Sequence, residues 1–411
     1  MLLIKRRLPV LALALSWVGA AMAQAVDEPA RTALDVSGFA TFGVVRSNTD
    51  AAQFVRYNQA SGATRNLDPG VDSNLGLQAT YQFTPLLSAT AQALTRQSIN
   101  GRYRPELTWA FVRYQPVPEW TLRLGRIAVP SNMISDYQNV GYANTMVRPP
   151  AEVYTEAAAE HMDGADVAYR HSIGDATLGL QLAAGYTRTA VVASNGGGEQ
   201  IPFMSHVRSL ALDLEWGPLQ LRVSQGLAKV TVPDVADLLA LRQGLTMQGF
   251  GTLANDLSGS QGKRYALSTL GLIFDQDQWL LQTEYSRRKN RDASYVPNSV
   301  AWYLMAGYRL GAWLPYYAHA VLRQTGTSIT LPANFPIDGP WGTAVRYGLL
   351  SGPEQHSDQV GLRWSLAPDR AVKVQLDRIV PTVKSGTLID GPAAGLKRPV
   401  LVWSAALDVV F

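Results

Sequence analysis

The sequence contains no cysteine among its 411 residues. Disulfide bonds, thiolate metal sites and a cysteine nucleophile are therefore excluded. Beyond residue 25 it also lacks any run of the roughly 18 apolar residues that would predict a membrane-spanning helix. Segments with the periodicity of an amphipathic helix are nearly absent as well. These absences exclude a helical membrane protein and leave β-structure as the main source of order.

The first residues have the composition of a secretory signal peptide. Three basic residues at positions 5–7 precede an apolar run, and Ala-Met-Ala at 21–23 supplies the small residues of a cleavage site. The apolar run is shorter than the roughly 20 residues that a spanning helix needs. We therefore predict that residues 1–23 are removed on export and that residues 24–411 form one domain.

Removal of this segment changes the charge balance of the protein. It takes away three of the 36 basic residues and none of the 32 acidic ones, which leaves 33 against 32. The basic character of the full chain therefore comes from the signal peptide. No basic tail remains that would predict nucleic acid as a partner.

Apolar and polar residues alternate in many short segments, as expected for strands with two different faces. In residues 177–188, Leu178, Leu180 and Leu182 alternate with Gly179 and Gln181. Segments of this kind recur along the chain, and we count about sixteen of them. The fold class predicted is all-β, with an antiparallel sheet.

The connections between these segments alternate in length. Short turns, such as those at Gly217-Pro218 and Gly311-Ala312, are rich in Gly, Pro and Asp. Short turns at one rim and long loops at the other are typical of a transmembrane β-barrel. The long connections fall at residues 48–70, 128–163, 189–206, 228–262, 326–357 and 379–399.

A soluble β-sandwich or β-propeller would also show alternating strands. Neither architecture predicts the alternation of long and short connections, or aromatic residues near the strand ends. In a membrane barrel such residues form girdles at the two interfaces. They are Tyr81, Phe83, Trp120, Trp216, Phe274, Trp279, Tyr308, Trp313 and Trp364.

Several segments resemble one known family when they are taken in order. Residues 121–154 read TLRLGRIAVPSNMISDYQNVGYANTMVRPPAEVY, residues 35–45 read DVSGFATFGVV, residues 360–378 read VGLRWSLAPDRAVKVQLDR, and the sequence ends at Phe411. This order resembles the trimeric porins of Gram-negative outer membranes, over essentially the whole exported chain. The resemblance implies a 16-stranded barrel, a homotrimer embedded in outer-membrane lipid, and a long third loop that folds into the lumen.

A barrel of about sixteen strands is wide enough to leave an aqueous channel once the inward side chains are placed. We therefore predict an outer-membrane porin through which small hydrophilic solutes and ions diffuse passively. No cofactor, metal or catalytic step is expected.

The third loop, at about residues 128–163, is the expected constriction, and it is acidic. Strand alternation points several charged side chains toward it, and a loop of one sign facing a wall of the other would set up a transverse field. General porins carry an arginine cluster on their early strands, whereas the fourth strand of this sequence places Glu106 toward the lumen. The predicted constriction and lining residues are Asp136, Glu152, Glu156, Arg96, Glu106, Arg123, Arg222, Arg363 and Lys373.

The third strand has an unusual outward face, made of Leu87, Ala89, Ala91 and Ala93. Small residues allow another protein surface to approach closely, whereas lipid favours larger side chains. We therefore predict that the first strands form the subunit interface of a homo-oligomer.

The alternatives to a general pore are a membrane-embedded hydrolase, a substrate-selective channel and a binding or adhesin barrel. A membrane-embedded hydrolase needs a nucleophile paired with histidine, but the five histidines are scattered, and His206 and Asp213 would lie more than about 20 Å apart on one strand. A substrate-selective channel and a binding or adhesin barrel acting through its long loops stay open. Residues 232–247, a potential loop helix, are compatible with each of these readings.

Overall fold

The computed structural model describes residues 33–411, except residues 58, 158, 193–198, 295, 347–349 and 393–394. It also leaves out the side chains of residues 237, 340, 341 and 344. The predicted signal peptide and its cleavage site lie outside the described residues.

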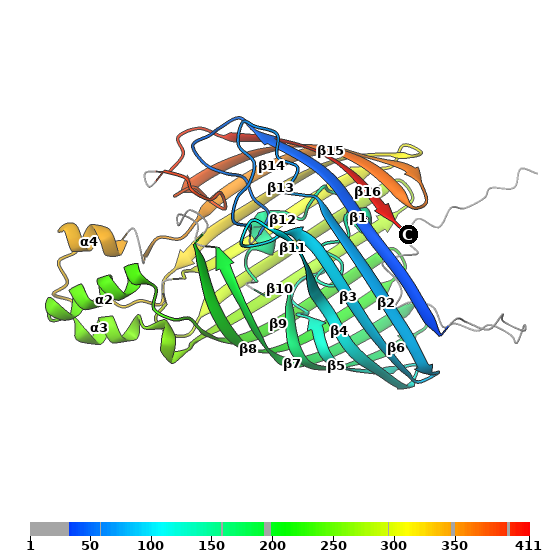
Figure 1. Cartoon of the computed structure of the whole chain (residues 1–411), viewed down its shortest axis with the longest axis horizontal. Coiled ribbons are helices and arrows are strands. Elements are labelled where there is room, and N and C mark those ends of the chain that lie inside the picture. The colour runs from blue at the N-terminus through cyan, green and yellow to red at the C-terminus, as the bar shows by residue number, and fades with distance from the viewer. Residues whose placement is uncertain are drawn as a thin grey trace, which may run out of the picture.

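Sixteen antiparallel strands form one closed barrel in which each strand pairs with its neighbours in sequence, as the sequence predicts (Figure 1). The first half comprises β1 (Leu34–Ser47), β2 (Asn74–Thr84), β3 (Leu87–Gln97), β4 (Tyr103–Val117), β5 (Trp120–Ala128), β6 (His161–Ile173), β7 (Ala176–Val192) and β8 (Gln200–Trp216). The second half comprises β9 (Leu219–Thr231), β10 (Lys263–Gln276), β11 (Trp279–Asn290), β12 (Asn298–Tyr308), β13 (Trp313–Gly326), β14 (Glu354–Ala367), β15 (Arg370–Val383) and β16 (Val400–Val410).

The barrel closes where β1 pairs with β16, from Phe39 opposite Val410 to Ser47 opposite Val402. Beyond this register, Gly38 and Phe411 exchange two backbone hydrogen bonds of 2.7 and 3.0 Å. Closure gives every strand a hydrogen-bonded neighbour on both sides, as a sheet in hydrocarbon requires because lipid offers no hydrogen-bond partners.

The two faces of the wall differ as the alternation predicts. On β8, Leu212 is 50% exposed on the outer face, whereas its neighbour Ala211 is completely buried on the inner side. Tyrosine, tryptophan and phenylalanine gather near the short-turn rim, where Trp313 stacks on Trp364 with ring centroids 4.7 Å apart. An outer face of exposed leucines bounded by aromatic rings matches a lipid environment.

Short turns join the strands at one rim. Gly217 turns β8 into β9 with φ of +55°, a left-handed conformation that glycine adopts without steric cost. The connections at the other rim are long, and some carry helices: α2 (Ala236–Met247) and α3 (Gly251–Asp256) precede β10, and α4 (Pro340–Val345) precedes β14. Within the described residues, no helix is both long and apolar enough to cross a bilayer.

Two long connections enter the barrel. The third loop, between β5 and β6, contains the 3₁₀ helix η1 (Gly141–Ala143) and the short helix α1 (Ala151–Tyr154), and it contacts inward side chains of many strands. The first loop, between β1 and β2, was predicted only as a polar connection. It buries Phe54, Ala63 and Val71 in one cluster with Val402 of β16.

An arginine placed on the lipid face tests the orientation of the wall. We expect Leu212→Arg to lower the free energy of unfolding by about 2–4 kcal/mol, because a charge near the bilayer midplane loses its hydration. Denaturant titration of the protein folded into phospholipid vesicles measures this change. Gln220→Arg, on the lumen side of β9, is the control and should change stability by less than about 0.5 kcal/mol. Equal effects at both positions would contradict the assigned faces.

Candidate pore constriction

The third loop leaves β5 and is fixed first to the wall of β9, β10 and β11. The carbonyl oxygen of Ser131 accepts hydrogen bonds from Ser224 Oγ at 2.6 Å and from Thr269 Oγ1 at 2.5 Å. The backbone N–H of Met133 donates to Glu284 Oε2 at 2.8 Å. These short side chains on neighbouring strands hold the loop against the inner face of the barrel.

Glu284 is a buried carboxylate that collects three donors. Besides Met133, the hydroxyl of Tyr303 donates to its Oε1 at 2.8 Å, and the hydroxyl of Tyr154 in α1 donates to the same oxygen. A buried carboxylate needs such donors because burial removes its hydration. Glu284 therefore joins both ends of the third loop to one point on β11.

The acidic residues of the third loop face the wall. Glu152 Oε1 accepts hydrogen bonds from Gln355 Nε2 and Ser357 Oγ, both at 2.7 Å, on β14. Glu156 is hydrogen-bonded to Ser299 and forms an ion pair with Arg288 at 3.3 Å. Both glutamates are buried, so they hold the loop in place and do not line open water.

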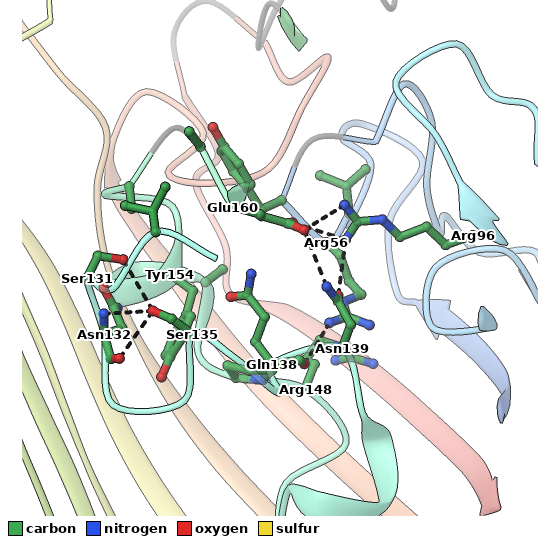
Figure 2. A pocket seen from close by; sticks show the side chains of 17 residues that line it. Arg56, Arg96, Ser131, Asn132, Ser135, Gln138, Asn139, Arg148, Tyr154 and Glu160 are labelled. Carbon is green, nitrogen blue, oxygen red and sulfur yellow. Dashed lines mark hydrogen bonds and ion pairs between the residues drawn. The ribbon is translucent and has the colours of Figure 1, made fainter. Parts of the chain in front are cut away.

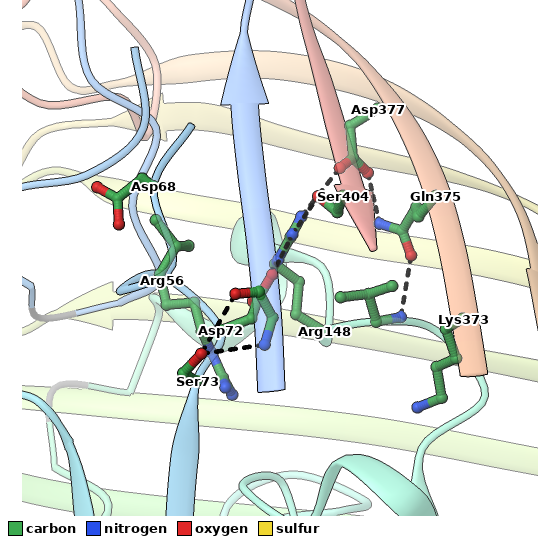
Figure 3. A network of polar contacts seen from close by, with 12 residues as sticks. Arg56, Asp68, Asp72, Ser73, Arg148, Lys373, Gln375, Asp377 and Ser404 are labelled. Carbon is green, nitrogen blue, oxygen red and sulfur yellow. Dashed lines mark hydrogen bonds and ion pairs between the residues drawn. The ribbon is translucent and has the colours of Figure 1, made fainter. Parts of the chain in front are cut away.

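Arg148 connects the third loop to the first loop and to strands β15 and β16 (Figure 3). Its guanidinium donates to Asp72 at 2.6 and 2.9 Å, to Asp377 at 3.0 Å and to Ser404 Oγ at 2.5 Å. The ring of Phe54 lies 4.8 Å from the guanidinium carbon. Burial opposes the charge of Arg148, but attraction to Asp72 and Asp377 outweighs it and raises the pKa of Arg148 above its ordinary value.

Lys373 and Arg363 bind the backbone of the same loop. Lys373 Nζ donates to the carbonyl oxygens of Gly141 at 2.6 Å and Met146 at 3.1 Å, and pairs with Asp408 at 2.9 Å. Arg363 donates to the carbonyl oxygens of residues 142 and 144 at 2.7 and 2.9 Å. The third loop therefore covers both cations. The sequence predicts instead that they face this loop across the aqueous lumen.

The remaining predicted wall cations are also paired. Arg96 makes two hydrogen bonds to Glu160, at 2.9 and 3.0 Å, at the end of the third loop. Arg123 donates to Asp166 on the adjacent strand through Nε at 3.0 and 3.1 Å. In a similar arrangement, Arg222 lies 3.6 Å from Asp213 and donates to Gln181 at 3.0 Å.

Two predicted acidic residues are less enclosed. Asp136 is half-buried on the third loop, where its charge acts on Arg123 and Asp213. Glu106 is exposed on β4 and lies opposite the inward residue Leu94, which places it on the lumen side. The lumen therefore differs from the predicted arrangement, because ion pairs across strands and loops replace an acidic loop facing a basic wall.

The first loop contributes residues to the lumen that its polar composition did not predict. Asp72 and Arg56 approach the third loop, and Arg56 donates to the carbonyl oxygen of Gln138 at 3.5 Å. The run QFVRY at residues 53–57 places three apolar or aromatic residues inside a polar connection. This pattern is the feature of the sequence that could have indicated a partly buried first loop. A cavity lies between the two loops, lined by Arg56, Arg96, Asn132, Gln138, Asn139, Tyr154 and Glu160, among others (Figure 2).

Histidine and carboxylate side chains are the groups from which a catalytic or metal site could be built in this chain. Within the described part of the chain, no group of three or more His, Asp or Glu residues could hold a metal ion. His319 Nδ1 and Asp358 Oδ1 do lie 2.8 Å apart. Their register with the outward residues Leu304 and Val360 places them on the outer face, away from solutes in the lumen.

A closed barrel of sixteen strands with charged inner walls and a loop fixed across its lumen defines the architecture of a porin. Residues 10–327 match the sequence family described as Gram-negative porin, and the chain belongs to that family. It forms a channel for passive diffusion in the outer membrane. No curated protein matches the chain in sequence.

Solved structures share the fold at low sequence identity. An anion-selective porin from Comamonas acidovorans is 14% identical, with a TM-score of 0.55, and the match covers 92% of this chain and 99% of that one. OmpF of Salmonella typhi, in complex with daunomycin, is 12% identical, with a TM-score of 0.51 over 92% and 97% of the two chains. OmpT of Vibrio cholerae is 9% identical, with a TM-score of 0.51 over 92% and 98%.

Acidification tests the tether between Arg96 and Glu160. Burial opposes the charge of Glu160, but Arg96 outweighs this effect and lowers the pKa of Glu160 below its ordinary value. The tether is therefore complete above the ordinary carboxyl range and is lost as pH falls through the lowered pKa. We expect the Glu160→Gln channel to show increased open-channel current noise at neutral pH, because the variant lacks the tether. The wild-type channel should show the same increase only in acid, where Glu160 is protonated.

Single-channel recording across a pH series measures this effect. Glu199→Gln removes an exposed loop carboxylate and is the matched control, which should behave as wild type. If Glu160→Gln and wild type gave the same noise at every pH, the tether would have no role in fixing the loop.

Proposed function

We propose that the third loop sets the size limit of the channel, and that small hydrophilic solutes pass between this loop and the part of the wall that it leaves open. One observation supports this most strongly: hydrogen bonds fix the loop to the wall at β9–β11, at β14 and at β15. A loop tied at several points has a fixed position, so the passage has a fixed width.

We further propose that the channel discriminates weakly between cations and anions. Most inward cations have a carboxylate beside them, so opposite charges cancel within a few ångströms and little net field reaches a solute. The pairs are Arg96 with Glu160, Arg123 with Asp166, Arg148 with Asp72 and Asp377, Arg170 with Glu215, Arg222 with Asp213, Arg288 with Glu156, and Lys373 with Asp408.

Asp136 is the best candidate for a charge that acts on passing solutes. It lies on the third loop and is half-buried, and the nearby Arg123 and Asp213 are already engaged with Asp166 and Arg222. Glu106 would act in the same way at the outer end of β4. Transport in this scheme needs no cofactor and no catalytic step.

Removing the charge of Asp136 tests this role. We expect Asp136→Asn to move the reversal potential in a salt gradient toward anion preference, with a change in permeability ratio of about twofold to threefold, because a partly solvated charge is screened. Planar-bilayer recording at low and high salt measures the shift, which should shrink at high salt.

Glu152→Gln is the comparison, since that carboxylate is covered by the loop and should influence selectivity less than Asp136. An equal shift for both variants, or none for Asp136→Asn, would remove Asp136 from the solute path.

We also propose that the chain assembles as a homotrimer through its first strands. On the outer face of β3, Ala89, Ala91 and Ala93 lie opposite Tyr81, Ala79 and Leu77 of β2. Four of these six residues are alanine, and such small side chains let a second protein surface approach more closely than the larger side chains that lipid favours.

A bulky residue in this patch tests the assembly. We expect Ala91→Trp to shift the detergent-purified protein from trimer to monomer while the barrel stays folded. Crosslinking and sedimentation measure the shift. Leu304→Trp, on the outer face of β12, should remain trimeric. Wild-type protein that crosslinks only as a monomer in native membranes would contradict the proposal.

A further inference from the structure

Two successive rows of inward residues on β2, β3 and β4 contain no charged side chain, although charged residues are common elsewhere on the inner wall. These three strands are neighbours in the sheet (Figure 1). We call the six residues of the two rows the neutral strip. In register they are Gln78, Gln92 and Trp109 in the first row, and Thr80, Thr90 and Phe111 in the second.

The side chains of the neutral strip face the lumen. Leu77 and Val112, which are next to strip residues along their strands, are 48% and 45% exposed on the outer face. Ala91, between two strip residues of β3, is also exposed there. Because successive side chains of a strand point to opposite faces, the strip residues point inward. Gln92 is buried, and the other five are half-buried.

The third loop contacts β3 immediately beside the strip. Leu94 lies in a cluster against which Val140 of the loop packs, and Arg96 donates two hydrogen bonds to Glu160. Gln92 is two residues closer to the short-turn rim than Leu94. A solute that passes the loop on this side of the lumen therefore meets the strip next.

The polar groups of the strip are ordered by one another. Thr108 donates to Gln92 Oε1 at 2.9 Å, and Gln92 Nε2 donates to Gln78 Oε1 at 3.1 Å. The hydroxyl oxygens of Thr80 and Thr90 are 3.0 Å apart. Among the residues that the structure describes, Gln78 Nε2 has no hydrogen-bond partner, so this half-buried amide can donate to a solute.

Two aromatic rings continue the strip on β4. The guanidinium carbon of Arg123 lies 5.4 Å from the centroid of the Phe111 ring. Within the described part of the chain, Trp109 makes no contact with another ring and no hydrogen bond through its side chain. Its half-buried indole therefore offers a flat apolar surface beside the amides of Gln92 and Gln78.

We propose that the neutral strip binds the pyranose rings of uncharged saccharides as they pass the third loop. One face of a pyranose ring consists largely of C–H groups, which pack on an aromatic ring, and its hydroxyl groups hydrogen-bond with amides and hydroxyls. A neutral aromatic solute fits less well, because it would cover the amides without giving them partners. This inference rests on the proposed channel and names a solute class for it.

Block of the ion current by a sugar tests the proposal with the whole barrel in planar bilayers. The probe is maltotriose, a neutral chain of three pyranose rings. The comparison is polyethylene glycol of the same mass, which is neutral and flexible but contains no sugar ring. We expect maltotriose to block the wild-type current in a saturable way, and polyethylene glycol to show no saturation.

Substitutions assign the block to the strip. We expect Trp109→Ala to weaken maltotriose binding about threefold to tenfold, because it removes the stacking surface, whereas Trp109→Phe keeps a ring and should lose less. Gln78→Ala should weaken binding about twofold to tenfold through the loss of a hydrogen bond. Gln220→Ala removes an inward amide of β9 outside the strip and should bind as wild type does.

Conductance in salt alone separates this inference from the channel function. A wild-type channel that conducts salt but shows no saturable block by maltotriose, or equal block by polyethylene glycol, would overturn the proposal and leave the channel intact. Saturable block by phenol without block by maltotriose would overturn it in favour of aromatic solutes. Equal sugar affinity in wild type, Trp109→Phe and Gln78→Ala would do so even if Trp109→Ala failed to fold.

Discussion

Every backbone N–H and C=O group of a strand in hydrocarbon must find its partner within the protein. This requirement makes the barrel close, because pairing of β1 with β16 removes the last open edge. It also determines which side chains face each way, since a closed ladder fixes the register of all sixteen strands. The fixed register therefore places leucines and aromatic residues on the outer face and polar residues on the inner face.

The inner wall faces a different physical problem. A loop laid across a lumen covers charged side chains and removes their water, so each charge must find an opposite charge or hydrogen-bond donors. Arg148 between Asp72 and Asp377, and Glu284 among two tyrosine hydroxyls and an amide, satisfy this condition. The interactions that place the loop therefore also neutralise much of the lumen.

The outer wall of the barrel also differs in composition from one side to the other. The outer face of β3 carries small residues, whereas β8–β13 carry exposed leucines and aromatic residues, which suits contact with lipid chains. One alternating pattern of strands therefore provides an inner face toward water and an outer face toward the membrane. Only the residues at the outward and inward positions differ between them.

The sequence by itself determined the fold class, the strand number and the position of the third loop, because a two-residue period and the lengths of connections are local properties. Leu178 to Leu182 alternate wherever the strand is placed. The sequence also selected Glu152 and Glu156 on the third loop and Arg363 and Lys373 on the wall. Only the tertiary structure decided that these side chains are covered where the loop meets the wall, and that Asp72 and Arg56 of the first loop approach the same loop. The reason is that charge pairing depends on which strands and loops meet, and such contacts join residues separated by more than 200 positions, as between Glu152 and Gln355.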